Sequence, residues 1–169
     1  MDEQGAWNRY GEKGTWYYEV EEPGYKMNMF DVQASLGLVQ LSRLDDMQAR
    51  REQIAKAYNQ AFQKEAGLIL PPVHHEGRHA WHLYVLQVDP KEAFITRDEL
   101  IDQLQKEYKI GTSVHFILFI CIHTINKPIT IHQRFPKSLA YYKRTLSLPL
   151  YPSMTDEDVQ DVITACCLF

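Results

Sequence analysis

The sequence has little of what marks a membrane-spanning or secreted protein. No run approaches the roughly 18 apolar residues of a membrane span, and the first residues, Met1–Gln4, lack the basic and apolar regions of a signal peptide. The three cysteines are an odd number without the spacing of a disulfide framework, which fits reduced thiols. We therefore expect a cytoplasmic protein with no membrane partner.

Concentrated positive charge is also missing. The net charge of -4 comes from interspersed signs, with no basic stripe of the kind that neutralises phosphate backbones, so nucleic acid is not an expected partner. The histidines gather in two stretches, but neither has the spacing of a structural zinc site, so we expect no metal. A metal-dependent enzyme, the weakest alternative, would have to use His74, His75, His79 and His82, or His115, Cys121 and His123.

What the chain does contain is enough for one main domain of mixed class. Its 169 residues, 45% of them hydrophobic, can bury a core of their own. Helical and extended patterns alternate along the chain. This alternation predicts an α/β fold, or a similar α+β fold, in which helices pack on a small sheet.

Capping signals and apolar periods predict the individual elements. Ser42 and Asp45 form a capping-box pattern before a long helix over 42–66, with Gly67 as its C-cap, and Asn28 can cap a short helix that starts near Phe30. The remaining predicted helices start at the Thr96/Glu99 and Thr155/Asp158 capping boxes and at Pro136, and the predicted strands cover 80–88, 110–116 and 146–150.

Residues 24–41 carry the most informative pattern, because they join a polar turn to an amphipathic helix as GYKMNMFDVQASLGLVQL. This segment resembles the DegT/StrS family of pyridoxal-phosphate-dependent sugar-nucleotide aminotransferases. There the same place reads Gly-Tyr-x-x-x-Met, followed by a stretch close to Thr-Asp-Ile-Gln-Ala-Ala-Leu-Gly-Leu. Later blocks resemble the family in its own order: QLSRLD at 40–45 with RR at 50–51 and YN at 58–59, HAWHLY at 79–84, IGTSVHF at 110–116, and TLSLPLYP at 145–152 with TDEDV at 155–159.

The resemblance implies the C-terminal domain of a fold-type I aminotransferase. Residues 1–27 would belong to the large domain, and residues 28–169 would form the small domain with the long connecting helix. The family's Schiff-base lysine and the acid that faces the pyridine nitrogen lie upstream of the Gly-Tyr turn. Lys13, Lys26 and Lys56 do not resemble the family's lysine motif. We therefore nominate no catalytic residue and expect this chain alone to be inactive.

Five residues are candidates for binding roles. In the family the Gly-Tyr turn approaches the cofactor phosphate of the partner protomer, which implies a homodimer and gives this role to Lys26 and Asn28. Both side chains suit an anion beside a helix N-terminus, although Asn28 as a simple cap and Lys26 as a solvated side chain are the alternative. His115 resembles the family's substrate-side histidine. His82 and Tyr84 share one face of the predicted strand, where they either face the substrate or pack in the core.

The resemblance also implies the reaction. The intact enzyme would use pyridoxal phosphate to move an amino group, from glutamate, onto a keto-sugar attached to a nucleotide. The family has a Pro after the histidine that matches His115, in a loop near the sugar, whereas residues 116–123 here read FILFICIH. The alternative is a non-catalytic binding or assembly module. The aromatic N-terminal residues favour it, because they would need a surface to cover: Trp7, Trp16, Tyr17 and Tyr18.

Overall fold

The computed structural model describes residues 24–25, 27–72, 77–118 and 135–167. The chain divides into two compact units, one up to Gln40 and one from Leu41 onward. The first described helix is α2, Asp31–Ser42. The domain boundary predicted between residues 27 and 28 stays a prediction.

The second unit is built on a three-stranded antiparallel sheet in the order β1-β2-β3. Its strands are β1 (Leu68–Ile69), β2 (Tyr84–Val88) and β3 (Thr145–Leu148). Along β2, buried and half-buried residues alternate, as expected for a strand with one face on the core. Tyr84 lies opposite Leu148, and Leu86 lies opposite Leu146. These four side chains therefore share one face of the sheet.

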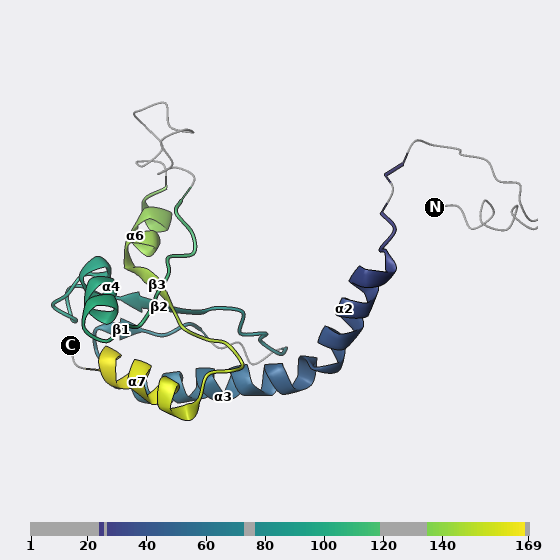
Figure 1. Ribbon diagram of the computed structural model, residues 1–169. Coiled ribbons are helices and arrows are strands. Elements are labelled where there is room, and N and C mark those ends of the chain that lie inside the picture. Colours follow the sequence, from purple (N-terminus) through teal and green to yellow (C-terminus); the bar gives the residue numbers. More distant parts are fainter. Residues whose placement is uncertain (1–23, 26, 73–76, 119–134, 168–169) are drawn as a thin grey trace, which may run out of the picture. The chain divides into compact units, whose positions relative to one another are not determined.

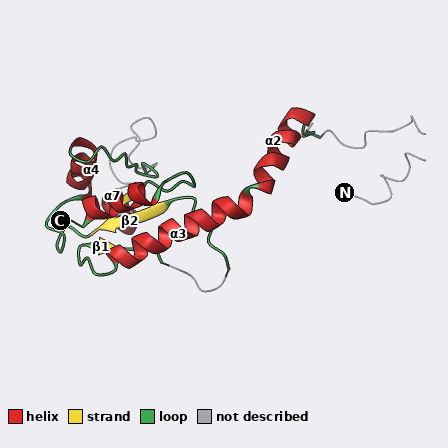
Figure 2. Cartoon of the chain, turned by 60° about the horizontal axis from the view of Figure 1, so that its bottom comes forward, coloured by secondary structure: helices red, strands yellow, loops and turns green. Residues whose placement is uncertain are grey.

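Helices pack on both sides of this sheet. α3 and α7 lie side by side along one side (Figure 1, Figure 2), and α6 contacts β2 and lies on the other side in Figure 1. The helices of this unit, within its described residues, are α3 (Leu44–Phe62), α4 (Arg97–Lys106), α6 (Pro136–Arg144) and α7 (Asp156–Cys166). The predicted fold class, a small α/β domain with a sheet packed by helices, is confirmed.

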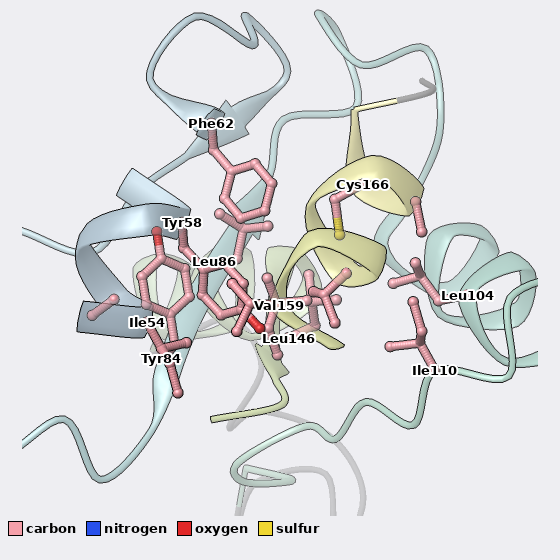
Figure 3. Packing of buried hydrophobic residues seen from close by; sticks show 14 of the residues in the cluster. Ile54, Tyr58, Phe62, Tyr84, Leu86, Leu104, Ile110, Leu146, Val159 and Cys166 are labelled. Atoms are coloured by element: carbon pink, nitrogen blue, oxygen red, sulfur yellow. The ribbon is translucent and has the colours of Figure 1, made fainter. Parts of the chain in front are cut away.

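The core lies where α3, α7 and the sheet meet (Figure 3). Tyr58 of α3 is fully buried, its ring stacks on Phe62 with 5.6 Å between ring centroids, and it meets Tyr84 of β2 edge-on at 5.0 Å. The Tyr58 hydroxyl donates to the carbonyl of Pro149 at 2.8 Å, so burial leaves no orphan donor. Val159 supplies part of the opposing wall from α7.

Both predicted capping boxes before α4 and α7 are present. The Thr96 hydroxyl accepts from the backbone N–H of Glu99 at 3.3 Å, and the Glu99 carboxylate accepts from the backbone N–H of Thr96 at 2.8 Å. Thr155 and Asp158 form the same reciprocal pair before α7. Pro136 occupies the first turn of α6, as predicted.

The long helix predicted over 42–66 is wrong at both ends. α2 ends at Ser42, and α3 begins at Leu44 with Arg43, and not Ser42, in the N-cap position. α3 ends at Phe62. Gly67 is not its C-cap. A Cβ on Gly67 would collide with the Ala93 backbone, so this glycine permits a close approach of two loops.

The predicted strands are longer than the observed ones. β2 starts at Tyr84 rather than at residue 80, because Trp81 has a positive φ of 46° that extended backbone does not allow. The segment 110–116 forms only an isolated bridge, between Ser113 and Ser147 of β3. β3 ends at Leu148 rather than at residue 150.

Candidate functional site

His115 is held beside the edge strand β3. The neighbouring Ser113 makes both backbone hydrogen bonds of an antiparallel bridge with Ser147, at 3.2 and 2.7 Å. The Ser147 hydroxyl lies 2.9 Å from Nδ1 of His115, whose side chain is otherwise exposed. This contact orients the ring and leaves Nε2 as the nitrogen that can meet a ligand. When Ser147 donates to Nδ1, Nε2 carries the proton and acts as a donor.

His82 and Tyr84 do not form the predicted pair on one strand face. His82 precedes β2 and is exposed, whereas Tyr84 is fully buried. The Tyr84 hydroxyl donates to Oδ1 of Asn59 at 2.8 Å, and burial raises the pKa of this phenol. The buried ring with its satisfied hydroxyl favours the core-packing interpretation of Tyr84. The role of His82 toward substrate stays a prediction.

A polar network that the sequence patterns did not reveal holds the loop before His82 against α3. The buried amide of Gln48 donates to the His79 carbonyl at 2.7 Å and to Glu52 at 2.9 Å. The Arg78 guanidinium donates to the same Glu52 carboxylate at 2.8 Å, and this hydrogen bond holds the pKa of Glu52 below its usual value. Spacing gives no signal for this network, because its members are 26 and 31 residues apart.

The predicted phosphate-binding turn is only partly described. Lys26 lies outside the described residues, and Asn28 is exposed. α2 begins at Asp31, and the Phe30 carbonyl accepts its first helical bond, from Ala34 at 3.0 Å. Asn28 therefore does not stand in the cap position, which removes the simple capping alternative. Its phosphate role stays a prediction.

The lysines of the described part are all on the surface. Lys106 pairs with Asp102 and Lys109 donates to the Lys106 carbonyl at 2.8 Å. An amine that forms an imine near neutral pH needs burial or a neighbouring cation to lower its pKa. The exposed lysines of the described residues are Lys56, Lys64, Lys91, Lys106, Lys109, Lys137 and Lys143.

The described part of the chain contains no arranged metal site and no membrane-spanning helix. No group of three or more His, Cys, Asp or Glu side chains in the described ranges is arranged to hold a metal ion. The histidine clusters considered above lie partly outside these ranges, at His74, His75, Cys121 and His123. None of the helices in this part of the chain is long and apolar enough to cross a membrane.

Comparison with known proteins decides the family. The sequence pattern of the DegT/DnrJ/EryC1/StrS aminotransferase family matches residues 2–166. The chain belongs to this family. The blocks that carried the resemblance, from the Gly-Tyr turn to the last helix, lie within that match, and the family consists of pyridoxal-phosphate-dependent sugar aminotransferases.

Individual relatives agree with this assignment. The chain is 63% identical over 164 residues to the spore coat polysaccharide biosynthesis protein SpsC of Bacillus subtilis, and 44% identical over 171 residues to the uncharacterized protein MJ1066 of Methanocaldococcus jannaschii. These matches cover 96% and 95% of this chain. The chain spans only 42% of the length of each relative.

Solved structures show the same fold. The putative sugar aminotransferase Spr1654 of Streptococcus pneumoniae, in its PLP form, matches 90% of this chain and 38% of its own, with a TM-score of 0.75 and 28% identity. Its PMP form matches 99% of this chain with a TM-score of 0.76. The predicted family of this chain is therefore confirmed from sequence and from structure.

Proposed function

We propose that this chain is the small-domain part of a pyridoxal-phosphate-dependent aminotransferase that acts on nucleotide-linked keto-sugars. The family match over residues 2–166 supports this most strongly, together with the 42% of relatives' length that the chain spans. One similar protein is named for spore coat polysaccharide biosynthesis and another is called a putative sugar aminotransferase, and both names fit a sugar acceptor. Glutamate as amino donor, a homodimer and a cytoplasmic location belong to the same proposal.

The donors of this chain suit the cofactor's phosphate and the substrate's oxygens. When bound, pyridoxal phosphate carries the amino group between donor and acceptor and withdraws electrons from the reacting carbon. The exposed Asn28 amide, ahead of the α2 N-terminus, can donate to a phosphate, and Lys26 would add a point charge. His115, oriented by Ser147, can donate from Nε2 to a sugar hydroxyl or a nucleotide phosphate.

The chain alone is expected not to hold the cofactor covalently, because the lysines of its described part are exposed rather than enclosed. We would incubate the 169-residue protein with pyridoxal phosphate, reduce with borohydride and locate the label by mass spectrometry. The expected result is no stoichiometric imine, only trace labelling spread over surface lysines. A single lysine labelled in every molecule would overturn this part of the proposal.

An assembly module without catalysis is the second candidate, and α2 favours it. No residue of α2 is buried, although its large apolar side chains lie on two opposite sides of the helix, with Val32 and Leu36 on one and Leu38 and Leu41 on the other. Each of these four is between 62% and 68% exposed. A patch of this kind marks a surface that a partner covers. Light scattering tests the idea, since a strictly monomeric protein at high concentration would count against it.

A further inference from the structure

Arg51 stands in the middle of the core-facing side of α3. It lies three residues after Gln48 and four and seven residues before Ala55 and Tyr58, all of which are buried. Residues at these spacings share one helix face. The Arg51 side chain is itself half-buried. Arg51 therefore places a positive charge on the buried face of α3, at a position where core packing alone would favour an apolar residue.

The guanidinium of Arg51 has no acceptor among the described residues. Its Nε is enclosed by protein atoms and has no hydrogen-bond partner. The two terminal nitrogens are not among the enclosed atoms that lack a partner, so they are the part of this half-buried guanidinium left for a ligand. The terminal nitrogens of a guanidinium form a planar fork that can make two parallel hydrogen bonds to one oxyanion.

The other arginines of the described part differ from Arg51 in their partners or in their exposure. Four of them have acceptors: Arg50 on Asp156 and the Met154 carbonyl, Arg78 on Glu52, Arg97 on the Thr145 carbonyl and Asp98, and Arg144 near Asp89. The remaining one, Arg43, is exposed, so water can solvate it. Among the arginines of the described ranges, Arg51 alone combines partial burial with the lack of an acceptor.

Two carboxylates of this region, Glu52 on α3 and Asp156 at the start of α7, bind other side chains. Glu52 accepts from Gln48 and Arg78, and Asp156 accepts from Arg50 at 2.8 Å. The charge of Arg51 is therefore not compensated by these groups. A partly desolvated charge without a counterion is costly, and an anion that supplies two acceptors removes that cost.

We propose that Arg51 is an anion-binding residue, whose guanidinium fork accepts a carboxylate or phosphate group of a ligand. This site is additional to the predicted phosphate contacts of Lys26 and Asn28. It rests on the packing of α3 and not on the proposed reaction, so it can be tested without activity. Carboxylate and phosphate share the required chemistry, two oxygens on one centre, and the experiment separates them.

The test is thermal unfolding of the 169-residue protein with sodium phosphate, sodium glutamate or sodium chloride at matched ionic strength. Saturation with the binding anion is expected to raise Tm by roughly 4 °C over chloride. Arg51→Met is expected to lose this rise and to be at least as stable as the wild type without the anion, because an uncompensated charge is replaced by an apolar side chain. Arg51→Lys keeps the charge without the fork and should lose most of the rise.

Arg43→Met is the matched control, since it removes the same charge from an exposed position and should keep the full rise. The Arg51 Nε–H resonance gives a second measurement that does not depend on variant stability, and it should move saturably with the binding anion. The proposal is overturned if Arg51→Met keeps the full rise, if neither anion raises Tm over chloride, or if the resonance does not move.

Discussion

The helices α2 and α3 are neighbours in the sequence and opposite in their packing. α3 buries five side chains, Gln48, Ile54, Ala55, Tyr58 and Phe62, although much of its sequence is charged or polar. α2 buries none, although it carries more large apolar residues per turn. Burial therefore follows the arrangement of apolar residues against a sheet and not their number. α2 has the composition of a helix that is covered on two sides, and the core of the second unit forms without it.

Truncation of a core side chain should give the largest difference between the two helices. Phe62→Ala removes a fully buried ring from α3 and is expected to cost about 3–5 kcal/mol in the free energy of unfolding. Leu36→Ala in α2 removes a side chain that is 62% exposed and should change stability by less than about 0.5 kcal/mol. Urea unfolding followed by circular dichroism measures both. Equal losses would show that α2 is covered in the folded protein and would break the comparison.

Glycine-to-alanine substitutions at two positions test the same difference between α2 and the packed second unit. Gly67→Ala places a Cβ against the Ala93 backbone, where there is no room, and is expected to cost roughly 1–3 kcal/mol. Gly37→Ala lies in α2 with no atom within 4 Å of the new Cβ, and should stabilise the helix by about 0.5–1 kcal/mol. The same urea experiment distinguishes the two signs. A destabilising Gly37→Ala would indicate a close contact at α2.

Elements whose stability is local were predicted from local signals in the sequence. The capping boxes at Thr96 and Thr155 and the first-turn Pro136 were predicted in place, because caps depend on residues three positions apart. A strand containing β2 was also predicted, over 80–88, since its apolar residues are nearly continuous. The blocks resembling the aminotransferase family were enough to identify the family from the sequence alone.

What the sequence missed depends on contacts between distant segments. The start of β2 moved because Trp81 turns the backbone, and the segment ending at His115 pairs with β3 through a single bridge rather than as a full strand. Gly67 looked like a helix cap and instead accommodates Ala93, 26 residues later. The unpaired Nε of Arg51 could not be found from the sequence, because the lack of an acceptor depends on where the fold places the carboxylates and carbonyls of distant segments.

The pH dependence of stability should show the smallest effect, and it should arise in the second unit. In the first capping box, the backbone N–H of Thr96 and, to a smaller extent, its hydroxyl lower the pKa of Glu99 below its usual value. In the second, the backbone N–H and the hydroxyl of Thr155 lower the pKa of Asp158 in the same way. A carboxyl whose pKa is lowered by folding stabilises the native state above its unfolded pKa and loses that contribution as the pH falls through its folded pKa. Stability should therefore be lost below about pH 4, where these carboxyls take up protons.

The double variant Glu99→Gln with Asp158→Asn keeps an acceptor at each position but cannot titrate, so its unfolding midpoint should fall less steeply from about pH 5 to about pH 3 than that of the wild type. Parallel profiles for the two proteins would mean that the caps do not contribute to acid sensitivity, and that other carboxylates, such as Glu52 beside Arg78, carry it.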